Sequence, residues 1–227
     1  MPGRIAQTVA DQQTLVHVMR HGEVHNPQGV LYERLPGYHL SANGLEMARI
    51  VAREYADVPL NHLRTSPLLR ARETMEPVAA EHPELSVHYD PNLIEAGNDF
   101  AGMKFGRYKT ALLDPRNWRL LRNPFTPSWG EPYEHIAQRM RTAIIDSARA
   151  AGPGGRAFLV SHQSPIWIAR LAFEGRRLFH LPWSRTSTLA SVTSFHFLDD
   201  ECVDISYSEP AAHLLGSDGN AAFSSGD

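Results

Sequence analysis

Short apolar runs alternate with amphipathic segments along the chain, and this alternation predicts strands and helices that follow one another. Four short runs are typical of strands buried in a sheet: residues 14–19, 60–66, 85–90 and 156–162. Helix-like spacing of apolar residues appears in segments 40–56, 66–82, 130–151 and 164–175. Near the end, residues 189–198 and 202–209 alternate enough to form a closing pair of strands.

Two helix starts are marked by small polar residues. Ser41 precedes the first helical segment, where its hydroxyl is suited to accept a bond from a free backbone N–H group. Ser66 is followed by Pro67, and proline is favoured at the first helical position. We therefore expect Ser41 and Ser66 to be N-caps.

Strands that alternate with helices predict an α/β layer fold with a mostly parallel sheet. We expect one domain over residues 1–210. Residues 91–130 are irregular and rich in Pro, Gly, aromatic residues and Arg, which indicates a lid-like insertion. Residues 211–227 are small and polar, so a disordered tail is expected there.

Composition narrows the class of protein. The chain has 227 residues and a formal net charge of −3, so it has no general attraction for nucleic acid or for an anionic membrane, and any anion site must be local. The single Cys202 excludes an internal disulfide and fits a reducing compartment. No export signal and no apolar run of about 18 residues is present, so we expect a cytoplasmic protein with no membrane span.

Three histidines spaced four apart, His17, His21 and His25, raise the question of a metal site. On a helix this spacing would place three imidazoles on one face. In a strand, residues four apart are separated by roughly 13 Å, because each residue advances the chain by about 3.3 Å. The apolar run favours a strand, which argues against a metal here. A three-histidine metal site is kept as a third reading, and it predicts stoichiometric metal and loss of activity with a chelator.

Reactive side chains follow three of the predicted strands. Arg20 and His21 end the first strand, Arg70 lies one turn into the helix after the second, and His162 ends the fourth. The carboxyl ends of parallel strands meet at one edge of a sheet, which is where ligands bind in such folds. Helix N-termini begin at the same edge and favour anions. Two imidazoles and two guanidinium groups at this edge indicate a phosphate site.

These residues lie in four segments that resemble the motifs of a known family. The segments VMRHGEVHN, TSPLLRARET, LIEAGNDFAG and VSHQSPIWIARL are similar, in this order, to the motifs of the histidine phosphatase superfamily, the phosphoglycerate-mutase-like enzymes. Together they span residues 15–173. The resemblance implies a three-layer sandwich with a mostly parallel central sheet flanked by helices.

The resemblance also implies site roles. His21 would attack phosphorus and become phosphohistidine, with its ring held by a backbone carbonyl. Arg20 and Arg70 would bind the oxygens of the transferring group, and His162 would be a further donor. Glu95 would protonate the leaving alkoxide and later take a proton from water. Fixed cations could do what a metal does in other phosphoryl transferases, so no metal or other cofactor is expected.

Several positions depart from the family pattern. Asn26 lies one place before the usual phosphate-contacting asparagine, so its assignment as a phosphate ligand needs the loop to adjust. Gln163 stands where glycine is common and could approach the site or shape the turn. Asp99 is the carboxylate nearest to Glu95 that competes for the role of acid, and Arg72 occupies a variable position of the second motif.

The main hypothesis is hydrolysis of a small phosphorylated metabolite, with inorganic phosphate as product. A phosphoglycerate-type mutase (an isomerase) is the first alternative, and a non-catalytic protein that binds phosphorylated ligands is the second. The lid-like insertion contains Lys104, Arg107, Arg116, Arg119 and Arg122 with Phe100, Phe105, Trp118 and Trp129. A solvated basic face with aromatic anchors is favoured for it over a seal around a second anionic group. The oligomeric state stays open, with a homodimer as one option.

Overall fold

One mixed sheet of six strands organises the chain. The computed structural model describes residues 13–103, 130–180 and 184–216. The strands are β1 (Thr14–Arg20), β2 (His62–Thr65), β3 (Val87–Tyr89), β4 (Arg156–Ser161), β5 (Val192–Leu198) and β6 (Glu201–Ser208). The helices are α2 (Ala42–Tyr55), α3 (Leu69–Glu81), α4 (Tyr133–Ala151) and α5 (Gln163–Phe173), with 3₁₀ turns η1 (Pro91–Leu93) and η5 (Ala212–Leu214).

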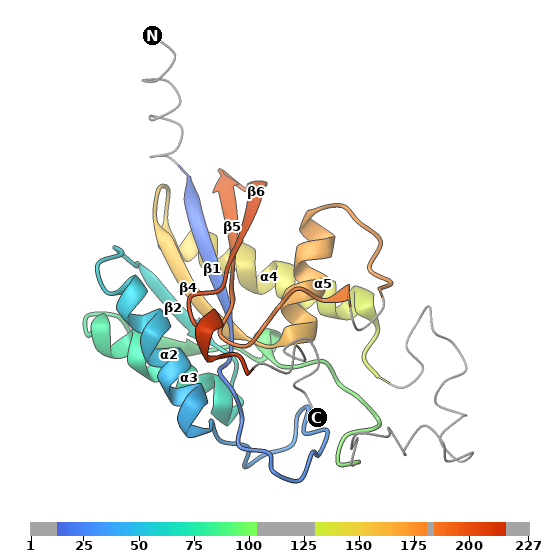
Figure 1. The fold of residues 1–227 in the computed structure, drawn as a ribbon. Helices are drawn as coiled ribbons and strands as arrows, with labels where there is room; N and C mark the ends of the chain where they lie inside the picture. The colour runs from blue at the N-terminus through green and yellow to red at the C-terminus, as the bar shows by residue number, and fades with distance from the viewer. Residues whose placement is uncertain (1–12, 104–129, 181–183, 217–227) are drawn as a thin grey trace.

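The strand order is β3-β2-β4-β1-β5-β6, with β1 near the middle (Figure 1). Strands β3, β2, β4 and β1 are parallel, whereas β5 runs antiparallel to β1 and β6 antiparallel to β5. The predicted α/β fold with a mostly parallel sheet is confirmed, and so is the closing pair of strands.

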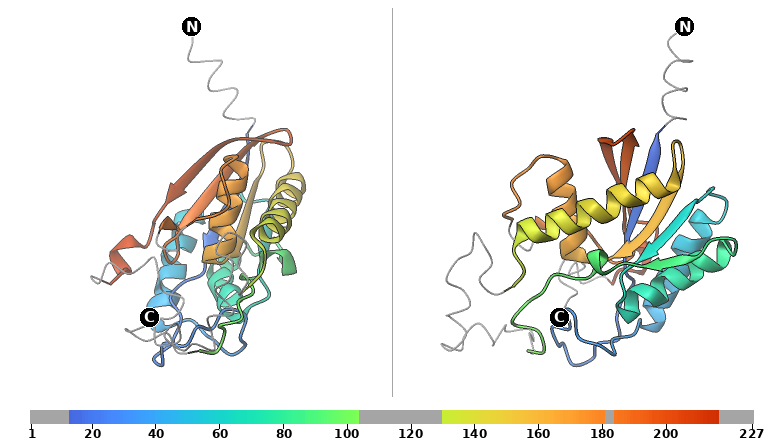
Figure 2. Two further views of the ribbon diagram at one scale, coloured as in Figure 1. Left: turned by 90° about the vertical axis from the view of Figure 1, so that its right-hand side faces the viewer. Right: turned by 180° about the vertical axis from the view of Figure 1, so that it is seen from behind.

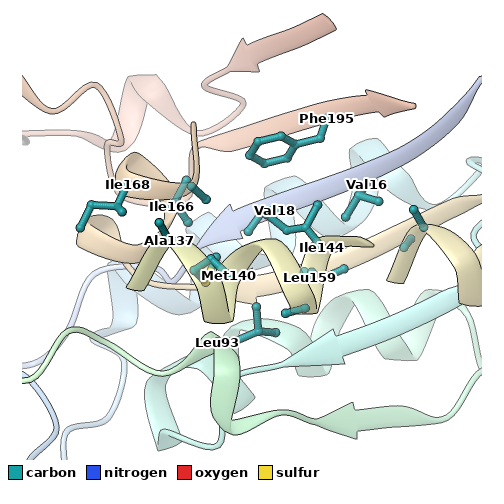
Figure 3. Close-up of a cluster of buried hydrophobic side chains, with 14 of the residues drawn as sticks. Val16, Val18, Leu93, Ala137, Met140, Ile144, Leu159, Ile166, Ile168 and Phe195 are labelled. Atoms are coloured by element: carbon teal, nitrogen blue, oxygen red, sulfur yellow. The ribbon is translucent and has the colours of Figure 1, made fainter. Parts of the chain in front are cut away.

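Each face of the sheet has its own hydrophobic core. Val16 and Val18 of β1 pack with residues of α4 and α5, which cover one face (Figures 2 and 3). Met19, which directly follows Val18 in β1, belongs to the other core, with residues of α2 and α3. Side chains alternate between faces in a strand, so one apolar run serves both cores. The result is the three-layer sandwich that the family resemblance implies.

The two predicted helix caps have different outcomes. The Ser41 hydroxyl accepts a bond from the Gly44 N–H group at 3.0 Å, as expected of an N-cap. The prediction for Ser66 is wrong, because α3 begins at Leu69 and its N-cap, Leu68, makes no side-chain capping bond. The Ser66 hydroxyl accepts a long bond from the Leu68 N–H group, at 3.4 Å, and lies 2.7 Å from His162 Nε2.

The structure differs from the expected tail at residues 211–216. Ala211 is buried in the core beside α2 and α3, and the Leu214 carbonyl accepts a bond from the Asn43 amide at 3.2 Å. Most of the lid-like insertion, residues 104–129, and the rest of the tail, residues 217–227, lie outside the described residues. Within the described ranges, no helix combines the length and apolar character that crossing a membrane needs.

Candidate active site

The end of β1 carries the first two site residues, Arg20 and His21, and both are buried. Gly22 follows, where the chain turns against the start of α2. A Cβ atom on Gly22 would lie 2.5 Å from the Gly44 carbonyl oxygen, so only glycine allows this close approach. The turn therefore fixes the backbone position from which the His21 side chain projects.

The His21 ring is held in one tautomer. Its Nδ1 atom lies 2.8 Å from the Gly22 carbonyl oxygen, which can only accept, so Nδ1 carries the hydrogen. Nε2 is then the atom with the free lone pair, and Arg70 donates to it from Nε at 3.3 Å. Burial, and then the charges of Arg70 and Arg20, hold the pKa of His21 well below its usual value. A neutral imidazole with an available Nε2 is the nucleophilic form.

Arg70 is placed by α3 and is buried. Its Nη2 atom donates to the Glu33 carbonyl oxygen at 2.6 Å, and its guanidinium lies over the Tyr32 ring, 4.8 Å from the centroid. The Thr74 hydroxyl joins α3 to the end of β1, since it donates to the Arg70 carbonyl at 2.7 Å and accepts from the Gly22 N–H group at 3.1 Å. Arg70 and the His21 turn are thus one connected unit.

Arg20 and Gln163 share one acceptor. Arg20 Nη1 donates to the Ser187 carbonyl oxygen at 2.7 Å, and Gln163 Nε2 donates to the same atom at 3.3 Å. Gln163 is the first residue of α5 and is buried. The residue that replaces the family's usual glycine therefore supports the segment against which Arg20 rests.

His162 faces His21, with ring centroids 5.1 Å apart and planes at 60°. Its Nε2 atom lies 2.7 Å from the Ser66 hydroxyl, and within the described part of the chain its buried Nδ1 atom has no hydrogen-bond partner. Burial, then Arg70 and His21, lower the pKa of His162 well below its usual value. These surroundings favour the neutral form of the His162 ring.

Glu95 is buried, whereas its competitor Asp99 is exposed. One Glu95 carboxylate oxygen accepts from the Ala96 N–H group at 2.8 Å. The negative charge of Glu95 raises the pKa of both Arg20 and Arg70, because the carboxylate lies near both guanidinium groups. Of the two candidate acids, Glu95 is the one that the fold brings to the site.

A network of ion pairs holds the Glu95 segment. Arg34 Nε donates to the Glu95 carbonyl at 2.7 Å, and Arg139 of α4 donates to the carbonyls of Asn92 and Ile94 at 2.6 Å and 2.7 Å. Both arginines also pair with Glu131, at 2.6 Å and 2.9 Å. The Glu95 segment is therefore held through its backbone carbonyl groups.

Three charged residues near the site were missed by the sequence interpretation: Glu33, Arg139 and Arg185. Arg185 donates to His180 Nε2 at 2.9 Å and to the Ser164 hydroxyl at 2.7 Å, and its charge acts on Arg20. The pKa of Arg185 is lowered, above all by burial. None of the three lies in a recognisable motif, and no local signal could have found them.

Other candidates lie elsewhere. Both polar ends of the Asn26 amide bond the Val30 backbone, at 2.9 Å and 3.1 Å, so Asn26 shapes its own loop. Arg72 is exposed and lies over the Tyr89 ring. His17 is buried, with Nδ1 2.8 Å from the Ser194 hydroxyl.

The described residues contain no group of three His, Cys, Asp or Glu side chains that could hold a metal ion. A groove of about 880 Å³ runs along α4 and the end of α5, lined by residues such as Arg141 and Asp146. The candidate site residues do not line it, so the groove and the site are separate features.

Comparisons with known proteins agree with this geometry. A family model described as "Histidine phosphatase superfamily (branch 1)" matches residues 16–208. An uncharacterized protein of Mycobacterium tuberculosis (strain ATCC 25618 / H37Rv) is 54% identical over 201 residues, which cover 88% of this chain and 98% of that protein.

Two solved structures illustrate the shared fold. A mycobacterial glucosyl-3-phosphoglycerate phosphatase superposes with a TM-score of 0.69 at 20% identity, over 87% of this chain and 98% of that one. A phosphoglycerate mutase from Bacillus anthracis str. Sterne superposes with a TM-score of 0.68 at 18% identity, over 91% of this chain and 97% of that one.

Proposed function

Because the chain belongs to the histidine phosphatase superfamily, we propose that it hydrolyses a small phosphomonoester through a phosphohistidine intermediate on His21, without a metal. Membership supports an enzyme that is a phosphatase or a mutase. The hydrolase, its substrate class and the roles of individual residues are our proposal.

The observation that carries the proposal is the state of His21. Its Nδ1–H group is bonded to the Gly22 carbonyl, and Nε2 points its lone pair toward the Arg70 guanidinium. A phosphoryl group bound by Arg70 would therefore sit against the one nitrogen that can attack it. Burial and nearby positive charge keep the ring neutral by lowering its pKa.

In the first step, His21 Nε2 forms a bond to phosphorus while the bond between phosphorus and the ester oxygen breaks. Arg20 and Arg70 would stabilise the charge on the three equatorial oxygens. Glu95 would give its proton to the leaving oxygen, so an alcohol departs rather than an alkoxide.

In the second step, a water oxygen forms a bond to phosphorus and the bond to His21 breaks. Glu95, now ionised, would take the proton from that water. Inorganic phosphate leaves, and His21 and Glu95 return to their starting states. His162, whose buried Nδ1 atom is unpartnered within the described residues, would contact a phosphoryl oxygen in both steps.

A phosphoglycerate-type mutase is the second candidate, and one observation favours it. Arg185 adds a third guanidinium, half-buried, whose charge acts on Arg20. A mutase substrate carries a second anionic group, which such a cation could hold. A protein that binds phosphorylated ligands without turnover is less well supported, because Glu95 is buried within the field of Arg20 and Arg70.

A panel of phosphorylated metabolites, each scored for free phosphate and for isomerised product, tests the proposal. We expect phosphate release without isomerisation, unchanged rates in EDTA, and inhibition by vanadate, which mimics five-coordinate phosphorus. His21→Ala should abolish turnover, whereas His25→Ala, at an exposed position of the same segment, should not. Turnover by His21→Ala within about tenfold of wild type would refute the nucleophile.

A further inference from the structure

Glu33 is an acidic residue that no motif of the sequence singled out. It lies in the loop between β1 and α2, next to the buried Tyr32. Its φ angle is +34°, a left-handed conformation that residues other than glycine adopt rarely and at a cost in free energy. The surrounding contacts must therefore hold this residue in place.

Two contacts hold Glu33, and both lead to the candidate site. Its carbonyl oxygen accepts from Arg70 Nη2 at 2.6 Å, which ties its backbone to the phosphate-binding arginine. One oxygen of its carboxyl accepts from the Asn98 amide at 3.2 Å, and Asn98 lies three residues after Glu95. Glu33 thus connects Arg70 with the segment that follows Glu95.

The charges around the Glu33 carboxyl come from three other elements. Glu95 follows η1, Arg70 lies in α3, and Arg185 precedes β5. Burial raises the pKa of Glu33 most, and Glu95 raises it further. The bond from Asn98 and the charges of Arg185 and Arg70 lower it, and the balance sets the pKa at about 8.

A carboxyl group in this state carries a proton at neutral pH. Unlike a carboxylate, a protonated carboxyl can donate a hydrogen bond as well as accept one. One oxygen accepts from Asn98, and within the described part of the chain the other oxygen has no hydrogen-bond partner, so a proton on it can be donated to a further acceptor. The phosphoryl and ester oxygens of a bound substrate are acceptors of that kind.

We propose that Glu33 is a second acid of the site, which contacts the bound phosphomonoester directly and donates a hydrogen bond to one of its oxygens. This inference rests on the proposed function and adds to it a second acidic residue that binds the substrate. Glu95 remains the group that transfers a proton, whereas Glu33 keeps its own proton and binds.

The sign of the pH dependence follows from this role. Below about pH 8 the Glu33 carboxyl is neutral and attracts the substrate as a donor. Above this value it becomes a carboxylate, which can no longer donate and repels the dianionic phosphate. Substrate affinity of the wild type should therefore fall as the pH rises through this range.

Glu33→Gln tests the role, because an amide has nearly the same shape and donates at every pH. The measurement is kcat/KM for an aryl phosphate from about pH 6.5 to about pH 9.5, taken as the ratio of variant to wild type, so that substrate ionisation cancels. We expect a ratio near one at neutral pH that rises on the order of tenfold at the alkaline end. Glu33→Ala should stay low throughout, and the exposed control Glu81→Gln should match wild type.

A binding experiment tests the role of Glu33 independently of the proposed hydrolysis. Inorganic phosphate is titrated into wild type at about pH 9 in buffers of different ionisation enthalpy, and we expect uptake of up to about one proton that Glu33→Gln lacks. This readout does not need turnover, so it holds even if the panel of substrates shows no hydrolysis.

Two results would overturn the role of Glu33. One is a ratio of Glu33→Gln to wild-type kcat/KM that does not change across the pH range, together with equal proton uptake by the two proteins. The other is a Glu33→Ala variant that keeps wild-type kcat/KM at neutral pH. Thermal unfolding of each variant shows whether a loss reflects the site or the fold.

Discussion

The Nε atom of Arg70 lies 3.3 Å from the Nε2 atom of His21, although the two residues are 49 positions apart in the chain. The guanidinium therefore occupies the position that a phosphoryl group would approach. In the proposed reaction, binding of the substrate would exchange this bond for bonds to phosphoryl oxygens. The relationship makes Arg70 the group whose removal is most informative.

Arg70→Lys should lower kcat/KM for a phosphomonoester on the order of a hundredfold or more, because an ammonium keeps the charge but loses the planar fork. Steady-state kinetics measures this. Arg72→Lys, two positions along the same helix and exposed, provides the matched control and should change kcat/KM little. Equal effects at both positions would argue against a phosphate contact by Arg70.

Glu95→Gln should slow the hydrolysis of alkyl phosphates on the order of a hundredfold, because an alkoxide needs a proton to leave. Hydrolysis of nitrophenyl phosphate should change far less, since nitrophenolate leaves without one. The comparison of the two leaving groups is the measurement. Asp99→Asn, at an exposed position of the same segment, is the control. Similar losses for both leaving groups would contradict the acid role.

Arg139→Met should both destabilise the fold and misplace the acid. The side chains of Arg139 and Glu131 are 13% and 17% exposed, so removing one partner leaves an enclosed charge at a cost of about 3 kcal/mol or more. The loss of the bonds to the Asn92 and Ile94 carbonyls frees the Glu95 segment, so kcat should fall more than KM rises. Urea unfolding and kinetics measure the two effects.

Arg149→Met, in the same helix, is the control for that variant. Its ion pair with Asp200 is exposed, with side chains 60% and 69% accessible, so its loss should hardly change stability. If Arg139→Met unfolded at lower urea but kept its kcat, the ion-pair network would support the fold without positioning Glu95.

Acid should destabilise the protein through His17. Burial, then Arg156 and His196, lower the pKa of His17 from 6.5 to about 4. Between these two values the unfolded chain binds a proton that the folded protein does not, so stability is lost as the pH falls. The full difference corresponds to about 3 kcal/mol.

His17→Gln should make the free energy of unfolding less dependent on pH between about pH 7 and about pH 4. Urea unfolding at several pH values provides the measurement, with the exposed His25→Gln as control. Parallel pH dependences for His17→Gln and wild type would show that His17 does not carry this effect.

Much of the fold and the centre of the site could be predicted from the sequence. Apolar runs of strand length and amphipathic helices repeat in an order that leaves few topologies, so β1, β4 and the helices between them were expected. His21 and His162 could be found because each ends a buried strand, and the sheet brings such ends together.

What escaped prediction depends on contacts between distant segments. Glu33, Arg139 and Arg185 have ordinary neighbours in the sequence, and only folding places them around Glu95 and Arg20. The start of α3 was misplaced for a similar reason. The Ser66 hydroxyl lies within hydrogen-bonding distance of His162, which follows β4, and no local pattern reveals that partner.

The backbone around His21 has one more consequence, for protein synthesis. Its N–H group bonds the Ser161 carbonyl at 3.1 Å, its carbonyl accepts from the Ala190 N–H group at 3.3 Å, and Arg20 donates to Ser187. Every one of these partners is translated at least 140 residues later. A nascent chain on the ribosome therefore carries Arg20 and His21 early, whereas the backbone groups that hold them are made only in the last third of the polypeptide.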